Sequence, residues 1–289
     1  MSAPSVEVLE KVVTPWVSQA FYTQGYYHLG GPVARAVDVA ALTTPAQIVD
    51  AWSLRYDGSP FDADPEFVDV LRFRVHPLMA LANPFDAPER PWPTYSNGFL
   101  SGSGVVAPVW ALERTRVPAG AELWRIERDG QQRFLTVFTG PARGWADSRA
   151  YFPPVHLVGT RAKWRDLDVP ADVVGDGSSV ELAIVGDRAP DGFEQVRPGV
   201  WSRVVPRDDV SELFEVVITA VYRDTACRVI QHTPNESRIL LLTDDPDTAS
   251  ALNAQEADIG VFEATVPTAE LSDIAGQSRQ AGSVAASTS

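Results

Sequence analysis

The spacing of hydrophobic residues predicts two helices in the first part of the chain. In residues 5–22, apolar side chains recur at helical intervals, which indicates a helix that Pro15 kinks or splits. Residues 43–54 show the same spacing after a clear start signal, because Thr44 can cap the helix and Gln47 can complete a capping box. Each helix is expected to offer one apolar face to a core.

From residue 68 onward the hydrophobic period becomes two, which is typical of strands. Residues 68–77 alternate apolar and arginine side chains and predict a half-buried strand. Residues 83–97 are rich in proline and aromatic residues and predict an ordered loop. Beyond it, short β-branched or aromatic runs alternate with turn signals, so this part is predicted to be mostly β. The small polar residues of 276–289 predict a disordered tail.

One phrase of the sequence occurs twice at a constant spacing. "GVWSRVVPRDDVSEL", from Gly199, matches "GVFEATVPTAELSDI", from Gly260, at an offset of 61 residues. Upstream, "WRD" at Trp164 matches "YRD" at Tyr222 at an offset of 58, and a small insertion around "DPDTASALN" accounts for the difference. A fainter similarity at 117–126 suggests a third copy.

The duplicated phrase predicts a tandem of modules of roughly 60 residues each. In each copy the glycine frees a tight turn, the following aromatic fills a small core, and the proline ends strand pairing. Short strands in such a length are typical of a small SH3-like barrel. The predicted fold class is therefore α+β, mostly β: an N-terminal α+β segment followed by tandem SH3-like small β-barrel modules. The predicted domains are 1–97 with the proline-rich loop, 98–158 as a β-rich segment and possible degenerate repeat, 159–217 and 218–275 as the two modules, and 276–289 as the tail.

Composition narrows the classes of partner. The chain has 24 Lys and Arg against 38 Asp and Glu, a net charge of −14. An acidic surface repels nucleic-acid phosphates and anionic lipid, so neither a nucleic-acid nor a membrane partner is expected. The sequence has no apolar run of about 18 residues and no signal-peptide pattern, which predicts a cytoplasmic location. The single cysteine, Cys227, excludes an intramolecular disulfide and is expected to be buried in a strand.

The repeated units resemble small β-modules from bacterial toxin–immunity loci of type VII secretion. The resemblance rests on an aromatic-Arg-Asp turn, a "DDP" segment, a Gly-Val-aromatic strand, a Val-Pro and an acidic-aliphatic exit, and it covers about residues 160–275. It implies a protein-binding role, and it carries over no catalytic residue.

A second interpretation is an NAD-consuming enzyme. In residues 117–135, "PAG…R…G…RFL" resembles the start of actinobacterial NAD-glycohydrolase toxins, and "LWR" resembles the first-strand arginine of ADP-ribosyltransferases. The resemblance implies that Arg125 holds the pyrophosphate, with Glu212 or Glu215 near the ribose. However, "ELFE" is not the expected Glu-x-Glu, and the same segment also fits a hairpin with surface arginines.

Tryptophan and aspartate residues supply the remaining candidate binding residues. Trp145, Trp164 and Arg165 combine tryptophan with neighbouring arginine, which is typical of interfaces, although the same tryptophans also fit a barrel core. Asp244 and Asp245 suggest an acidic contact, although Asp245 followed by proline also fits a helix cap. The four histidines lack the spacing of a metal site, so the sequence predicts neither a metal nor a cofactor.

These observations favour a non-catalytic, protein-binding protein, specifically an immunity-like protein that masks a toxin's active site through an acidic face. Occlusion needs a complementary surface and steering charges, and it needs no catalytic residue. The NAD-consuming enzyme and a secretion-associated scaffold are the alternatives. Loss of NAD hydrolysis on replacing Arg125 would support the enzyme, and a stable, non-toxic partner would support the scaffold.

Overall fold

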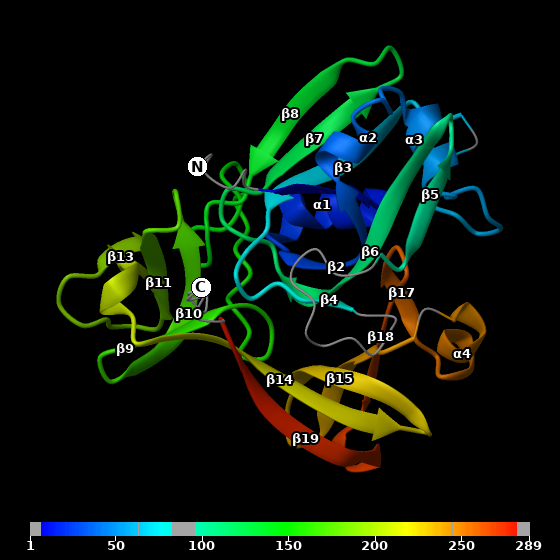
Figure 1. Cartoon of the computed structure of the whole chain (residues 1–289). Helices are drawn as coiled ribbons and strands as arrows, with labels where there is room; N and C mark the ends of the chain where they lie inside the picture. Colours follow the sequence, from blue (N-terminus) through cyan, green and yellow to red (C-terminus); the bar gives the residue numbers. More distant parts are fainter. Residues whose placement is uncertain (1–6, 63, 83–95, 244, 282–289) are drawn as a thin grey trace, which may run out of the picture.

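The computed structural model describes residues 7–62, 64–82, 96–243 and 245–281. The chain is mostly β, with 50% strand and 13% helix, and its strands form two antiparallel sheets. In Figure 1 the first sheet lies in the upper part, and the two duplicated units lie to its left and below it. The expectation of a mostly β fold is confirmed.

The first sheet has eight strands in the order β4-β6-β2-β1-β3-β7-β8, with β5 paired to β6. These strands come from both sides of residue 97, so one sheet joins the predicted segments 1–97 and 98–158, and the domain limits stay a prediction. The elements of this part are β1 (Val8–Val13), α1 (Pro15–Gln24), β2 (His28–Arg35), α2 (Ala36–Val39), α3 (Pro45–Ala51), β3 (Phe67–Arg74), β4 (Leu81–Ala82), β5 (Gly98–Gly102), β6 (Val105–Arg116), β7 (Glu122–Glu127) and β8 (Gln132–Val137).

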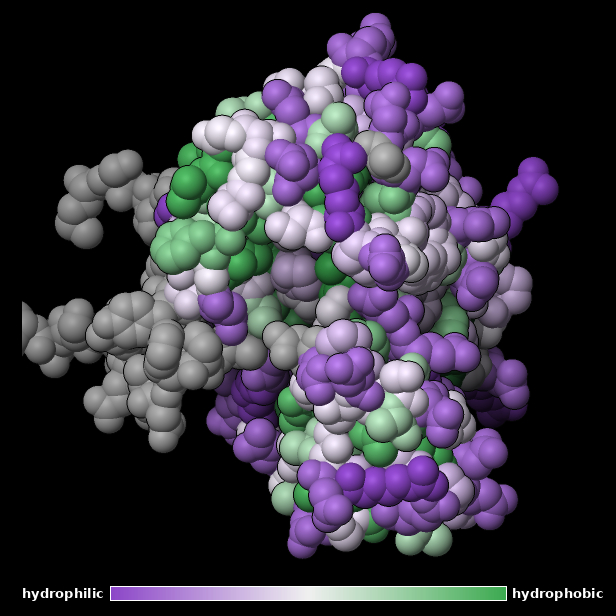
Figure 2. Space-filling view, turned by 90° about the vertical axis from the view of Figure 1, so that its right-hand side faces the viewer, coloured by the Kyte–Doolittle hydropathy of each residue, from purple (hydrophilic) through white to green (hydrophobic). Residues whose placement is uncertain are grey.

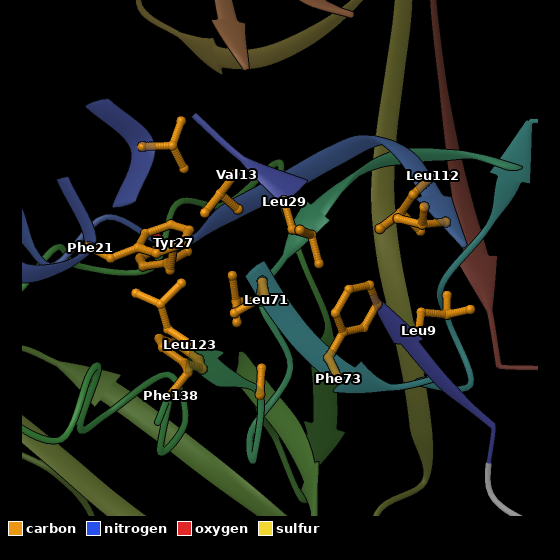
Figure 3. Close-up of a cluster of buried hydrophobic side chains, with 14 of the residues drawn as sticks. Leu9, Val13, Phe21, Tyr27, Leu29, Leu71, Phe73, Leu112, Leu123 and Phe138 are labelled. Atoms are coloured by element: carbon orange, nitrogen blue, oxygen red, sulfur yellow. The ribbon is translucent and has the colours of Figure 1, made fainter. Parts of the chain in front are cut away.

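Helices pack on both faces of the first sheet. On one face, Phe21 of α1 packs in a core with Leu71 and Phe73 of β3, as Figure 3 shows. On the other face, α2 and α3 pack in a second core that contains Val70 of β3. The strand predicted at 68–77 therefore forms over Phe67–Arg74. Helices cover its second face at Val68 and Val70, whereas Arg72 is partly exposed and Arg74 is exposed, in line with the predicted alternation.

The helix predicted over residues 5–22 is wrong in its first half. β1 occupies Val8–Val13, and α1 begins only at Pro15. Thr14 caps this helix by accepting a hydrogen bond from the backbone N–H of Val17 (3.4 Å). Pro15 starts the helix and does not kink it, because the first helical position needs no N–H donor. β1 forms instead because β2 and β3 lie on either side of it and pair with it.

The helix predicted over residues 43–54 is confirmed as α3. The Thr44 hydroxyl accepts a hydrogen bond from the backbone N–H of Gln47 (3.4 Å), and the Gln47 side chain accepts one from the backbone N–H of Thr44 (3.1 Å). Both halves of the capping box are therefore present.

The second sheet has eleven strands along the order β12-β13-β11-β10-β9-β14-β15-β16-β18-β17, with β19 paired to β14. Cys227 is buried in β15, as predicted. The elements are β9 (Arg161–Trp164), β10 (Leu167–Val174), β11 (Ser179–Val185), β12 (Glu194–Arg197), β13 (Val200–Pro206), η1 (Arg207–Asp209), β14 (Glu212–Tyr222), β15 (Thr225–His232), β16 (Glu236–Leu241), α4 (Pro246–Ala251), β17 (Gln255–Asp258), β18 (Val261–Pro267), η2 (Thr268–Glu270) and β19 (Leu271–Gln280).

The two copies of the repeated phrase follow the same backbone path. Gly199 precedes β13 and Gly260 precedes β18, with left-handed φ angles of 69° and 63°. Both strands end at a proline and lead into a short 3-10 turn, η1 or η2. The edge strands β12 and β17 pair with them in matching registers, and each has a bulge at the corresponding position. Residues that are 61 positions apart in these two segments therefore match in backbone structure as well as in sequence.

One long strand, β14, belongs to both repeats. Its first residues, 212–214, pair with β9 of the first repeat, and its last residues, 218–222, pair with β15 of the second. β19 is the last strand of the second repeat, as β14 is the last strand of the first. The pair Ala275–Thr219 in the second repeat is equivalent to the pair Phe214–Arg161 in the first. The last strand of one repeat thus continues as the first strand of the next.

This shared strand explains where the barrel prediction departs from the structure. Neither sheet closes on itself within the described residues, so closed SH3-like barrels are not confirmed. Because β14 runs on into the second repeat, both repeats share one open sheet. The third copy suggested at 117–126 does not follow this pattern, since β7 lies between β3 and β8 in the first sheet. The predicted insertion is occupied by α4.

The tail predicted from residue 276 begins too early. Residues 276–280 are the end of β19 and pair with β14. Residues 282–289 and residues 83–95 of the predicted loop lie outside the described residues. None of the helices in the described part of the chain is both long and apolar enough to cross a membrane.

Candidate functional site

A groove of about 590 Å³ separates α1 from the second repeat. One wall consists of α1 and nearby aromatic side chains, and the other consists of the edge strand β17 and its neighbour β18. Residues far apart in the sequence meet there, because the first sheet docks against the second repeat at this place. Its lining combines aromatic and amide side chains, among them Trp16, Gln24, Phe152, Asn253 and Gln255.

Trp16 links the two walls of the groove. The cap at Thr14 starts α1 so that Trp16 lies in its first turn. The indole Nε1 of Trp16 donates a hydrogen bond to the carbonyl oxygen of Ala257 in β17 (3.2 Å). The side chain is still 43% exposed. The indole therefore presents a fixed apolar surface to the groove.

A chain of charged groups runs from the groove into the interior. Arg238 contacts one carboxylate oxygen of Glu263 (2.6 Å), and the other oxygen contacts Arg114 (2.5 Å). Arg114 also donates a hydrogen bond to the Tyr26 hydroxyl (2.5 Å). Burial raises the pKa of Tyr26 to about 12, so its hydroxyl stays protonated near neutral pH. Each of these groups is engaged by a neighbour.

His28 lies beside this chain, and neither of its ring nitrogens has a hydrogen-bond partner among the described residues. Its ring packs against Tyr26 (5.0 Å between centroids) and Phe152 (6.1 Å). Burial, and then the charge of Arg114, hold the pKa of His28 well below its ordinary value. A neutral imidazole of such low basicity is a poor general base, so His28 acts as an aromatic filler of the interior.

Two further buried ion pairs lie at this junction. Lys11 of β1 contacts Asp258 of β17 (3.2 Å), with side-chain exposures of 0% and 2%. Burial lowers the pKa of Lys11, and Asp258 opposes that shift. Arg228 of β15 contacts Glu215 of β14 (2.9 Å) and donates a hydrogen bond to the carbonyl oxygen of Arg114 (2.6 Å). The Lys11–Asp258 pair and the hydrogen bond from Arg228 to Arg114 hold the first sheet against the duplicated part.

The structure does not bring the sequence-predicted catalytic residues together. Arg125 of β7 donates two hydrogen bonds to Asp69 (2.8 and 2.9 Å) within the first sheet. Glu212 lies in the second sheet in an ion pair with Lys163, and Glu215 is buried against Arg228. To bind a pyrophosphate, Arg125 would have to leave Asp69.

The predicted binding residues have mainly structural contacts. Trp145 is fully buried, and its Nε1 donates a hydrogen bond to the Tyr26 carbonyl oxygen (2.6 Å), so it lies in a core, which the sequence analysis gave as the alternative to an interface. It is buried because α1 covers it, with Phe21 stacked at 4.5 Å between centroids. Trp164 is 3% exposed, and the Arg165 guanidinium lies over its ring at 4.2 Å.

Of the two predicted acidic binding residues, Asp244 and Asp245, only Asp245 is among the described residues. Asp245 caps α4 by accepting hydrogen bonds from the backbone N–H groups of Asp247 (3.2 Å) and Thr248 (3.1 Å), as the helix-cap interpretation predicts. A hydrogen bond from the Thr248 hydroxyl, followed by these backbone bonds, favours the ionised form and lowers the pKa of Asp245. Asp244 lies outside the described residues.

Sequence reasoning missed Trp16, His28, Arg238 and Glu263. A signal for the last two was present in the repeat itself. In the first repeat the equivalent positions are Glu181 and Ser202, which share a hydrogen bond of 2.7 Å. Charged residues inside strands whose neighbours are apolar indicate a buried polar partner.

Among the described residues, no group of three or more His, Cys, Asp or Glu side chains could hold a metal ion. No protein-family model matches the chain, and neither a curated protein nor a solved structure matches it.

Proposed function

We propose that this chain is a non-catalytic protein-binding protein whose duplicated part recognises a positively charged partner. The observation that carries the proposal is the distribution of charge. Residues 159–275 contain 22 Asp and Glu against 10 Lys and Arg, a net of −12 out of −14 for the whole chain. The remaining residues are almost neutral, so the acidic character belongs to the repeats.

The second repeat is the more acidic of the two. Residues 218–275 contain 10 Asp and Glu and 3 Lys and Arg, and all three basic residues, Arg223, Arg228 and Arg238, are in ion pairs, with Glu270, Glu215 and Glu263. In Figure 2, hydrophilic side chains cover much of the lower part of the face, where this repeat lies. Such a field attracts a cationic partner and speeds its association. The exposed carboxylates of the second repeat include Asp224, Glu236, Asp245, Asp247, Glu270 and Asp273.

The kind of binding protein that we propose is an immunity protein that occludes the active site of a toxin. Occlusion requires an interface of standard size and no reacting group. This agrees with the charged groups of the groove, which are engaged by one another, and with Arg125, which is engaged by Asp69. We expect this binding to take place in the cytoplasm, the compartment that the sequence predicts.

The test is co-expression with the product of the adjacent open reading frame. We expect the two proteins to elute together in size-exclusion chromatography, and we expect this chain to restore the growth of cells that express its neighbour. Raising the salt concentration should weaken the complex, because exposed charges are screened within about 8 Å at physiological ionic strength.

Charge reversal supplies a matched control. Replacing Asp224 and Asp247 of the second repeat with Lys should weaken the complex, whereas replacing the exposed Asp57 and Asp62 near the first sheet should not. Equal effects would contradict recognition through the repeats. A stable complex with a harmless partner would favour the secretion-associated scaffold, and absence of any complex would overturn the proposal.

A further inference from the structure

β19 ends the tandem at the position where another repeat would begin. β14 closes the first repeat and opens the second, and β19 stands in the same position at the end of the second. One edge of β14 is paired with β9 and β15, and its other edge is paired with β19. The inner edge of β19 is thus occupied by β14, and no described strand pairs with its outer edge.

The backbone groups on that outer edge can be identified. The backbone N–H of Ala281 donates a hydrogen bond to the carbonyl oxygen of Leu213 in β14 (3.0 Å), so Ala281 points inward. Backbone groups alternate in direction along a strand, so the N–H and C=O groups of Gly276, Ser278 and Gln280 point outward. An unpaired row of this kind is a template for another strand.

β19 has one bulge, at Asp273 and Ile274, and beyond it, over Ala275–Gln280, it lacks the features by which proteins usually protect an edge. It is ten residues long, and all but its residues 271 and 279 are exposed. It contains no proline or lysine, and its one basic residue, Arg279, contacts Glu113 of β6 (2.6 Å). The edge strands β12 and β17 of the same sheet are four residues long and each is interrupted by a bulge, whereas β19 pairs regularly over Ala275–Gln280. Short, interrupted edges resist strand addition, and a longer regular stretch invites it.

We propose that the outer edge of β19 binds an extended, positively charged segment of a partner protein by strand addition. The inference rests on the proposed function, and it names the surface and the chemistry of the partner. In this binding mode, main-chain hydrogen bonds supply affinity and alternate side chains supply specificity. Ile274, which is 58% exposed, offers an apolar contact to one face of the added strand.

The charge of the segment follows from the surroundings of β19. The strand belongs to the more acidic repeat, and it carries Asp273 three residues after Glu270 of the preceding turn. Arg279 is engaged by Glu113, so it does not oppose a cationic segment. A second copy of this chain would bring another net charge of −14 to the edge, so a cationic segment is the favoured occupant.

The experiment uses the full chain and a synthetic peptide as the probe. The peptide is as long as β19 and alternates Lys with Val, and a second peptide carries Glu in place of Lys. We expect the Lys peptide to bind in fluorescence anisotropy and the Glu peptide to bind at least about tenfold more weakly. Hydrogen exchange should show protection of the amides of Gly276, Ser278 and Gln280 when the Lys peptide is bound.

A proline variant separates this edge from the acidic surface as a whole. Ser278→Pro removes an outward N–H and keeps the inward ladder, so peptide binding should weaken by about tenfold. Ser278→Ala keeps that N–H and should bind like the original chain. Thermal unfolding checks that the proline variant is folded, and the exchange measurement on the unaltered chain does not depend on it.

Three results would overturn the strand-addition proposal. Binding of the Lys peptide without protection of the outward amides would place it elsewhere on the acidic repeats, and the proposed function would still stand. Self-association that Ser278→Pro abolishes would identify a second copy as the occupant. No binding of the Lys peptide would refute this edge, while the neighbouring-gene experiment would test the proposed function separately.

Discussion

The ion pair between Lys11 and Asp258 gives the sharpest test of how the two sheets are joined. Replacing Lys11 with Met keeps a long side chain in place and removes its charge. Asp258, with 2% side-chain exposure, then keeps one hydrogen bond, from the backbone N–H of Ile259 (2.9 Å). Its carboxylate would have lost its cation in a site that water does not reach.

The expected loss of stability follows from the burial of this ion pair. Removing one partner of a buried pair destabilises a protein by about 3–5 kcal/mol, whereas an exposed pair contributes about 0–1 kcal/mol. Because both side chains are almost fully buried, we expect Lys11→Met to lower the free energy of unfolding by about 3–5 kcal/mol. The double variant Lys11→Met, Asp258→Asn removes both charges and should recover more than half of that loss.

Urea unfolding followed by tryptophan fluorescence measures both variants, with the free energy obtained by linear extrapolation. A loss below about 1 kcal/mol for Lys11→Met would mean that the pair is solvated and that β1 and β17 do not dock as described. A double variant no more stable than the single one would show that the unpaired charge of Asp258 does not cause the loss of stability.

Three further predictions concern single groups. Below about pH 6.5 the original chain should lose up to about 1.4 kcal/mol of stability per pH unit, because unfolding lets the neutral His28 take up a proton. His28→Phe should abolish this loss, as measured by urea unfolding at several pH values. An unchanged pH dependence would contradict this. Gly199→Ala and Gly260→Ala should each cost about 1 kcal/mol in thermal unfolding, because both glycines have left-handed φ angles. An added Cβ would meet its nearest atom at 3.9 Å in both places and so would add no clash. Strongly unequal losses would speak against equivalent repeats. Arg125→Ala should lower the free energy of unfolding by about 2–3 kcal/mol in urea, because the buried Asp69 loses its cation and both hydrogen bonds from Arg125 and keeps only the one from the Ser18 hydroxyl. A specific loss of NAD hydrolysis in this variant would revive the enzyme hypothesis.

The sequence did not show the contacts of the candidate residues where those contacts come from neighbours distant in the chain. Glu215 was a candidate for ribose contact, and it is held by Arg228 of the adjacent strand. Trp145 was a candidate interface residue, and it is covered by Phe21 of α1. The groove was not predicted, because Trp16 and Ala257 meet only when the first sheet docks on the second repeat.

The sequence by itself determined the features that depend on short-range sterics and hydrogen bonds. The capping box of α3, the cap at Asp245 and the glycine and proline positions of both repeats all form as their local chemistry requires. Tertiary structure decided which apolar stretches become strands, since β1 exists only between β2 and β3. It also decided that the repeats share β14 in an open sheet and do not close as barrels, because strand pairing joins residues whose separation in the chain leaves no local signal.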